Sequence, residues 1–466
     1  MSNMQAQERS KMLGSMPMTQ LVPKISVPIM ISMLVQALYN VVDSIFVARF
    51  DARALTAVSL AMPVQMLMIA VCVGLATGIN SLISRRLGEK RNDEARAAAW
   101  NGIFLELCGF LLFLIFGIFF TRPAFDALSN GLEAEVQEII REYGYQYLGI
   151  VTTFSIGSFM AVVFERMMQS TGNTVLSMIT QLSGAITNLI LDPIMIFGLL
   201  GFPKLGAAGA AIATVIGQWV SMLVGFGINQ KKNVELKLEM KEFALNTRSI
   251  RDILSVGLPS VVMQAISSVM NILLNMILIP YGSVAVNVLG VYFKLQSFVF
   301  MPVFGLSNGM VAIVGYNYGA RLRARVYSAI RVALIYALVI LGIGMLAFLV
   351  IPGALLSLFE QEGGDAALTA MGIPALRTIS LCFLMAAVGI TLSTVFQAVG
   401  KGSYSLIVSL CRQLLVLIPS AWLLSLIFGE VGAIWWSFVI AEGISMVISI
   451  ALYRRVDRLL LKRLDT

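Results

Sequence analysis

Two aspartates interrupt stretches of the sequence that are otherwise apolar, and the first of them ends a polar helix face. Asp43 follows Gln36, Tyr39 and Asn40 at spacings of seven, four and three residues. At 3.6 residues per turn, these four side chains share one face of a helix. A charged side chain at the centre of a bilayer costs roughly 2.5–3.5 kcal/mol unless it is paired or hydrated. We therefore expect this face to look into a polar cavity.

The second aspartate, Asp192, lies four residues after Asn188 and directly before Pro193. A proline inside a helix removes a backbone hydrogen bond and leaves carbonyl oxygens exposed. We expect Thr214 to lie nearby. Two neighbouring carboxyl groups can hold and release a proton, and together with amide, hydroxyl and carbonyl oxygens they could also coordinate sodium. The alternative is that each aspartate only caps a broken helix or binds a structural water.

The second half of the chain offers two cations in apolar surroundings, Lys294 and Arg412. Each could contact a substrate, act in a gate or pair with Glu442. In the first half, Glu165 stands beside Arg166, and we expect these two to form an ion pair at a helix end. These charges are weaker candidates for function than the two aspartates.

The composition places all these residues in a membrane. Of the 466 residues, 58% are hydrophobic and 12% are charged, whereas soluble proteins carry roughly 25% charged residues. Windows of about 19 residues predict an all-α integral membrane protein with twelve transmembrane helices. The predicted spans are 23–47, 55–84, 95–120, 138–164, 174–200, 207–229, 251–279, 285–314, 325–350, 366–398, 403–427 and 432–453.

The sequence contains no histidine, which is the commonest neutral-pH general base and zinc ligand. Its four cysteines are isolated, so no CxxC pair is available for a metal. We expect neither an enzyme nor a bound cofactor. A membrane-embedded enzyme would need a cluster of nucleophile, base or metal ligands, and the sequence offers none.

Basic residues are distributed unevenly between alternate loops. One set of loops and the two termini carry 25 of the 33 lysines and arginines, and the other set carries 4. Since cytoplasmic loops carry the excess of basic residues, we expect both termini to be cytoplasmic in a multi-pass protein of the plasma membrane. The net charge of +8 largely reflects this bias, so it does not indicate a nucleic-acid partner.

The two halves of the sequence resemble each other at an offset of 231 residues. Six spans per half predict two pseudo-symmetric lobes in a parallel repeat, a transporter architecture with the pathway between or within the lobes. The predicted organisation is an N-terminal segment 1–22, a lobe 23–229, a linker 230–250, a lobe 251–453 and a tail 454–466. The matching pairs are Pro28 and Pro259, Asn40 and Asn271, Ala54 and Ala285, Gly74 and Gly305, Gly78 and Gly309, and Gly88 and Gly319.

These features together resemble the multidrug and toxic compound extrusion (MATE) family. The motifs that carry the resemblance are ISVPIMISMLVQALYNVVDSIFVARF, the glycine segments GLATGINSLISRRLG and GLSNGMVAIVGYNYG, MMQSTGNTVLSMITQLSGAITNLILDPIMIFG, and GAAGAAIATVIGQ. The resemblance spans about 20–455. It implies two six-helix lobes around a V-shaped central cavity. It also implies antiport of amphipathic, often cationic, compounds against protons or sodium by alternating access.

Within that family the chain resembles the DinF-like branch. By similarity, Asp43 and Asp192 match the paired acidic positions of its N-terminal lobe, and Gln36, Tyr39, Asn188 and Thr214 match polar cavity positions. The NorM-like branch depends on acidic residues of the C-terminal lobe, but here the seventh, eighth and tenth spans have no mid-helix Asp or Glu. We therefore expect ion coupling at Asp43, Asp192, Asn188 and Thr214, and a substrate cavity that includes Gln36, Tyr39, Asn40, Lys294 and Arg412.

A second interpretation keeps the fold and changes the cargo, making the protein a flippase for lipids or lipid-linked oligosaccharides. Such relatives commonly line the cavity with basic side chains for phosphates, and here Lys294 and Arg412 are the available ones. A channel is disfavoured because no ring of pore groups is evident. We expect a monomer, since one chain contains both lobes of the pathway.

Overall fold

The computed structural model describes residues 12–129, 134–239, 241, 243–359 and 366–464, and these residues form helices and no strand. Ten of the described helices are long and apolar enough to cross a membrane. Two bent pairs, α6 (Ala134–Thr153) with α7 (Ile156–Ser170) and α14 (Ala366–Ser380) with α15 (Phe383–Ala398), each pass the same test as one broken span. The predicted all-α fold with twelve spans is confirmed.

The first half contains the following helices: α2 (Met18–Phe50), α3 (Ala52–Gly88), α4 (Asn92–Ile115), a π-helical turn (Phe116–Phe120), α5 (Thr121–Ser129), α6, α7, α8 (Thr174–Phe197) and α9 (Ala207–Lys232). The second half contains α10 (Thr247–Leu278), α11 (Ser283–Gly319), α12 (Arg323–Val350), α13 (Pro352–Ser357), α14, α15, α16 (Gly402–Leu410), a π-helical segment (Cys411–Val416), α17 (Leu417–Phe428), α18 (Val431–Ile434) and α19 (Trp436–Leu459). Short 3₁₀ turns cover Leu199–Gly201, Val234–Leu236, Ile279–Tyr281 and Leu461–Arg463.

The internal repeat extends to fine detail of the backbone. Shifting the bounds of α3 by 231 residues gives those of α11. Lys90 and Arg321, which differ by the same offset, both have left-handed backbones with φ of 59° and 57°. The two broken spans bend by 43° and 48° at matching places. The two halves are therefore copies of one six-span unit.

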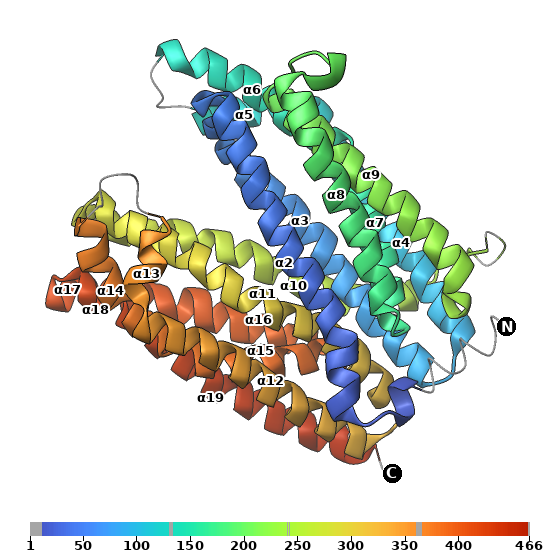
Figure 1. Ribbon diagram of the computed structural model, residues 1–466. Helices are drawn as coiled ribbons and strands as arrows, with labels where there is room; N and C mark the ends of the chain where they lie inside the picture. The colour runs from blue at the N-terminus through green and yellow to red at the C-terminus, as the bar shows by residue number, and fades with distance from the viewer. Residues whose placement is uncertain (1–11, 130–133, 240, 242, 360–365, 465–466) are drawn as a thin grey trace.

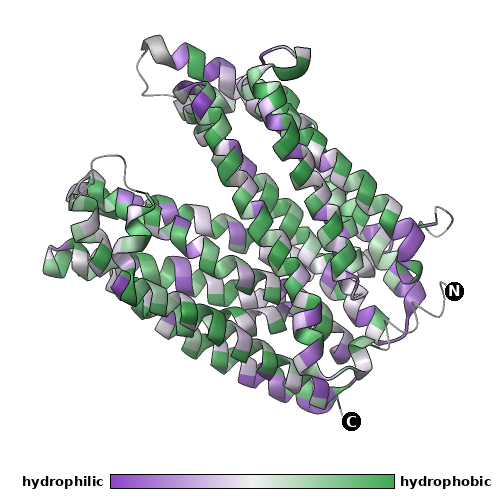
Figure 2. Ribbon diagram, viewed as in Figure 1, coloured by the Kyte–Doolittle hydropathy of each residue, from purple (hydrophilic) through white to green (hydrophobic). Residues whose placement is uncertain are grey.

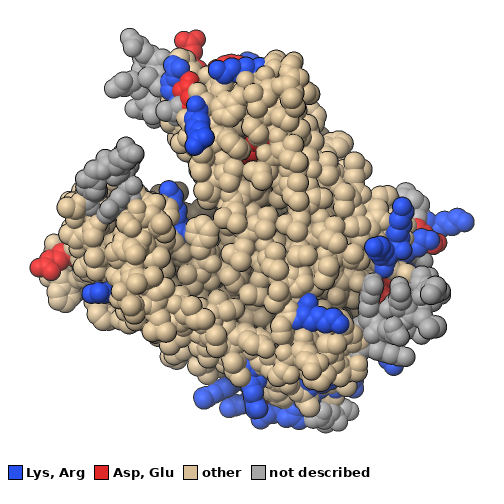
Figure 3. All heavy atoms as spheres, in the orientation of Figure 1, with Lys and Arg blue, Asp and Glu red and all other residues tan. Residues whose placement is uncertain are grey.

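The two halves form the arms of a V (Figure 1). The N-terminal lobe, α2 to α9, is one arm and the C-terminal lobe, α10 to α19, is the other. The described part of the chain begins and ends near the joined end, and the space-filling view shows a notch between the arms at the opposite, open end (Figure 3). Apolar residues cover most of both arms (Figure 2), while lysines and arginines gather around the joined end.

Glycines of the repeat hold the arms together at the joined end. A Cβ on Gly88 would lie 2.0 Å from the backbone oxygen of Tyr316, and one on Gly319 would lie 2.1 Å from the backbone oxygen of Arg85. Only a residue without a side chain permits so close a crossing of α3 and α11. Gly78 packs in the same way on α10, and Gly309 packs on α2. The repeated glycines therefore build the seam between the lobes.

The segments that lead into each lobe are held by the opposite lobe. The backbone oxygen of Leu13 accepts hydrogen bonds from Asn317 (3.1 Å) and Arg325 (3.0 Å) of the C-terminal lobe. In the equivalent contact on the other side, Asn101 of α4 donates a hydrogen bond to the backbone oxygen of Ala244 (3.1 Å), in the segment that precedes α10. We call these contacts the crossed clasp. They add a second set of contacts that closes the joined end.

Candidate functional site

The polar face of α2 lies against α8 inside the N-terminal arm. These two helices pack along each other, and the Gln181 side chain of α8 donates a hydrogen bond of 2.7 Å to Gln36 of α2. Gln36 and Tyr39 are both half-buried and lie against one another. Asn40 also lies on α2, but its side chain is outside the described residues.

The two aspartates meet at this interface. The carboxyl groups of Asp43 and Asp192 lie within hydrogen-bonding range of each other. Asp192 is fully buried and Asp43 is half-buried. Asn188 donates to Asp192 Oδ1 (3.2 Å) and to the hydroxyl of Thr214 (3.3 Å) on α9. Four residues predicted from the sequence thus form one cluster, which we call the carboxyl pair site.

The carboxyl pair site has no cationic partner among the described residues. Neither aspartate forms an ion pair with a lysine or arginine of the described chain. Three of its buried oxygens, Asp43 Oδ1, Asp192 Oδ2 and Asn188 Oδ1, also have no hydrogen-bond donor. A buried carboxylate without a partner is costly. Oxygen donors of this type suit a proton or a small hard cation such as sodium.

The ligand set for a cation would combine carboxylate with amide and hydroxyl oxygens. Among the described residues, no three His, Cys, Asp or Glu side chains are grouped so as to hold a metal ion. A sodium ion here would therefore rely on Asn188 and Thr214 as well as on the two aspartates.

Three residues of this region were not predicted from the sequence: Gln181, Gln65 and Tyr147. Gln181 precedes Asn188 by seven residues, the same spacing that links Gln36 to Asp43, so its place on the polar face of α8 could have been predicted. Gln65 of α3 and Tyr147 of α6 share a hydrogen bond of 3.2 Å beside the aspartates. Their approach depends on how separate helices pack, which no local spacing reveals.

In the C-terminal arm, the carboxylate within the membrane has a cationic partner. Arg412, on the π-helical segment, forms an ion pair of 3.2 Å with Glu442 of α19. Of the roles considered for Arg412, the ion pair with Glu442 is the one found. Lys294 is exposed on α11, and its ammonium lies 5.8 Å from the ring centre of Phe359. Neither cation joins the carboxyl pair site.

A further carboxylate is buried within the N-terminal arm. Glu106 of α4 is fully buried, and neither of its carboxylate oxygens has a hydrogen-bond partner. The expected ion pair between Glu165 and Arg166 is not formed. Arg166 instead donates to Gln169 at 2.7 Å, because adjacent side chains of a helix point in different directions, whereas those three residues apart share a face. Both charged residues lie inside the lobe rather than at an exposed helix end.

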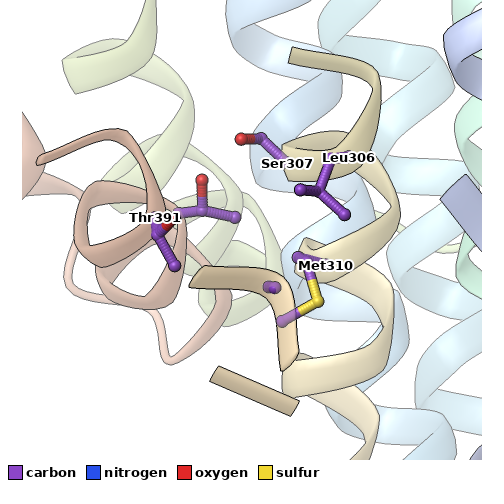
Figure 4. A pocket seen from close by; sticks show the side chains of 6 residues that line it. Leu306, Ser307, Met310 and Thr391 are labelled. Atoms are coloured by element: carbon purple, nitrogen blue, oxygen red, sulfur yellow. The ribbon is translucent and has the colours of Figure 1, made fainter. Parts of the chain in front are cut away.

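One small cavity lies in the C-terminal arm between α11, α12 and α15. Ser307 and Met310 of α11 face Thr391 of α15 across it (Figure 4), with Ala333 and Thr394 completing the wall. It has room for about one water molecule. A drug-sized ligand needs several hundred Å³, so this cavity is too small to hold one.

Comparisons with known proteins agree with this architecture. The MatE family model matches residues 28–194 and again 259–423, one match in each half. Multidrug export protein MepA of Staphylococcus haemolyticus is 28% identical over 420 residues, which cover 90% of this chain and 89% of that protein.

Two solved structures share the fold over almost their whole length. A MATE structure in the bent conformation has a TM-score of 0.89 and 25% identity, covering 98% of this chain and 99% of that one. An outward-facing multidrug resistance MATE family transporter of the MOP superfamily has a TM-score of 0.87 and 26% identity, covering 97% and 98%. These relatives are transporters and export proteins rather than enzymes, as expected for this chain. The family model covers both halves of the repeat, and the chain therefore belongs to the MatE family.

Proposed function

We propose that the protein is a secondary active multidrug efflux transporter that exchanges amphipathic, often cationic, organic compounds for protons or sodium ions. Family membership and the MepA relatives named as multidrug export proteins support the cargo class. The observation that carries the exchange is the carboxyl pair site, where Asp43 and Asp192 lie together without a cationic partner in the described chain. A proton or sodium ion supplies the missing positive charge.

The helix α2 links ion binding to the seam between the lobes. It carries Asp43 toward the open end, while its Ser26 and Met30 pack on Gly309 and Gly305 of α11 nearer the joined end. Pro28 lies between these two contacts, where the backbone hydrogen bonding of the helix is interrupted. A shift of α2 driven by ion binding therefore reaches the seam.

Alternating access requires the joined end to open when the other end closes. The ion can drive this change only by binding one state more tightly than the other. We infer that the ion-loaded protein favours the V described here and releases substrate. Loss of the ion then favours a state in which the α3–α11 crossing and the crossed clasp have parted.

We further propose that the open end of the V faces outward from the plasma membrane. The excess of basic residues around the joined end supports a cytoplasmic position for that end. The likeness to a structure described as outward-facing supports the same orientation. Because both lobes and the notch between them belong to one chain, we expect a monomer to transport.

The flippase alternative is less well supported. It would need basic side chains free to bind phosphate groups. Arg412 is engaged by Glu442, which leaves Lys294 as the exposed one of the two cations considered for that role. The C-terminal arm therefore offers little positive charge for a lipid phosphate inside the notch.

The test is ethidium efflux from proteoliposomes, driven first by a pH gradient and then by a sodium gradient. We compare the wild-type protein with Asp43→Asn and with Glu430→Gln, which alters an exposed carboxylate. We expect one gradient to drive efflux, Asp43→Asn to abolish the drive and Glu430→Gln to leave it intact. Full ion-driven efflux by Asp43→Asn would refute the site. No ethidium movement by folded wild-type protein under either gradient would favour the flippase.

A further inference from the structure

The two lobes carry different charges at the joined end, although they are copies of one unit. In the N-terminal lobe, the turn between α3 and α4 pairs its cations with acids. Arg86 contacts Glu89 (2.8 Å) and Glu94 (3.2 Å), and Arg96 contacts Asp93 (2.5 Å). The positive charge of this turn is thus largely neutralised within the protein.

The C-terminal lobe lacks these acids. At the repeat offset, Asp93 and Glu94 correspond to Ala324 and Arg325. The end of α19 adds further basic residues, with Asp457 as the acid among them. We define the basic patch as the arginines here whose side chains form neither an ion pair nor a hydrogen bond with another described residue. They are Arg321, Arg331, Arg454, Arg455 and Arg458.

A contact between helices joins the two parts of this patch. The hydroxyl of Tyr327, in the first turns of α12, donates a hydrogen bond to Asp457 in the last turns of α19. The arginines of both helices are therefore held at one end of one arm. The space-filling view shows blue side chains gathered along this edge (Figure 3).

The basic patch adjoins exposed apolar surface, and this position indicates that the patch lies at the boundary of the membrane. On α12, Arg331 continues a stripe of exposed apolar residues, Ile335, Val339 and Ile343, at intervals of four. This stripe has helical spacing on the outer surface of a membrane-spanning helix, so it faces lipid tails.

The stripe on α19 has the same form. Ile440, Ile444 and Val447 are exposed, and the same face continues through Ala451 to Arg454 and Arg458. In both helices the lipid-facing stripe ends in arginine. Arginines at that boundary stand at the depth of the phospholipid headgroups.

We propose that the basic patch is a binding surface for anionic phospholipid headgroups. Guanidinium groups bind phosphate oxygens in pairs of hydrogen bonds, and each basic residue near an anionic membrane contributes about 1 kcal/mol of attraction. Continuity with the apolar stripes favours a lipid, which supplies a tail for the stripe and a phosphate for the arginines. The equivalent turn of the N-terminal lobe, between α3 and α4, carries internal ion pairs instead. The inference does not depend on what the protein transports.

The test compares two triple variants in lipid nanodiscs. One variant, Arg454→Gln, Arg455→Gln and Arg458→Gln, removes three charges from the patch. The matched control, Lys90→Gln, Lys231→Gln and Lys232→Gln, removes three exposed charges without an ion-pair partner among the described residues from the same end of the N-terminal lobe. The readout is the preference for spin-labelled phosphatidylglycerol over phosphatidylcholine at the protein surface, with thermal stability in each lipid as the check on folding.

We expect wild-type protein to prefer phosphatidylglycerol, and the preference at low salt to fall up to about fivefold for each patch arginine removed. The control variant should keep most of the preference. Equal losses in both variants would overturn the proposal, because general positive charge would then suffice. The absence of any preference in the wild-type protein would also overturn it. Stronger binding of a soluble polyanion such as RNA than of the anionic lipid would assign the patch to another partner.

Discussion

The two arms place carboxylates in the membrane in contrasting ways. In the N-terminal arm, Asp43 and Asp192 lie together, and neither has a cationic partner among the described residues. In the C-terminal arm, Glu442 has its own cation, Arg412, at 3.2 Å. The same six-span unit therefore holds a carboxyl site without a cationic partner in one arm and an ion-paired carboxylate in the other.

Under the proposed function, this difference explains how a fold with two similar arms can bind its coupling ion in one arm. A carboxylate paired with an arginine gains little from an external cation, because its charge is already balanced. Two carboxyl groups without a cationic partner gain far more from a bound cation, so we propose that the coupling ion binds there and that its binding is linked to a change of shape. On this account the N-terminal arm binds the coupling ion and the C-terminal arm does not.

The largest effect is expected from Asp192→Asn, which keeps the size of the side chain and removes its charge. Ion-driven efflux should fall by more than about tenfold, because interactions with a charged group are worth about 1.5–3 kcal/mol. Substrate binding measured by equilibrium dialysis shows whether the fold is retained. Unchanged efflux by this variant would remove the distinction between the arms.

Removing the cation of the C-terminal arm should lower stability and leave ion coupling unchanged. Arg412→Gln leaves Glu442 unpaired, and we expect a cost of roughly 1–3 kcal/mol, less than for a fully buried pair. The double variant Arg412→Gln with Glu442→Gln should recover most of the thermal stability and should retain ion-driven efflux. Loss of ion drive in a stable double variant would place coupling in both arms.

Where the arms meet, the molecule is symmetric, and matched substitutions should have matched effects. Gly88→Ala and Gly319→Ala each force a methyl group against a backbone oxygen at about 2 Å. Overpacking of this kind costs about 1–3 kcal/mol, and parting the lobes relieves it. Both variants should therefore increase labelling of a cysteine placed near the seam at the joined end. Gly290→Ala on α11, with no atom within 4 Å, is the control; a change in only one of the two glycine variants would contradict the symmetry.

The smallest effect concerns the helix starts at the open end. Asp51 caps α3 by accepting a hydrogen bond from the backbone nitrogen of Arg53 (2.8 Å), whereas its repeat partner before α11 is Gly282. The hydrogen bond from the Arg53 side chain lowers the pKa of Asp51. Asp51→Gly should cost only a few tenths of a kcal/mol. Because the pKa is lowered on folding, this contribution is present above about pH 4 and is lost as the pH falls further; thermal unfolding at pH 7 and pH 3 measures it.

The sequence was sufficient for the spans and for most of the carboxyl pair site, for physical reasons. A membrane span must be apolar over about 20 residues, so each one is visible in composition. The polar faces of α2 and α8 follow helical spacing, so Gln36, Tyr39 and Asp43 could be assigned to one face, and Asn188 and Asp192 to another. The repeated glycines were equally visible in the sequence, although their role in the α3–α11 crossing was not.

Contacts between helices could not be predicted in the same way. The pairing of Gln65 with Tyr147 and the crossed clasp around Leu13 each join segments that are far apart in the chain. The first membrane span, α2, also begins at Met18 rather than at residue 23, because buried Leu21 and Val22 extend the packed region beyond the apolar window. Packing between lobes decides these details, and no local pattern records it.

The most direct test of the account measures ion movement coupled to substrate in proteoliposomes, using an internal pH dye and radioactive sodium. Wild-type protein, Asp43→Asn, and the double variant Arg412→Gln with Glu442→Gln are compared under the same ethidium gradient. The account predicts that ethidium drives one of the two ions in the wild type and in the double variant, and neither ion in Asp43→Asn. Coupled ion movement that survives Asp43→Asn, or that disappears in the stable double variant, would contradict it.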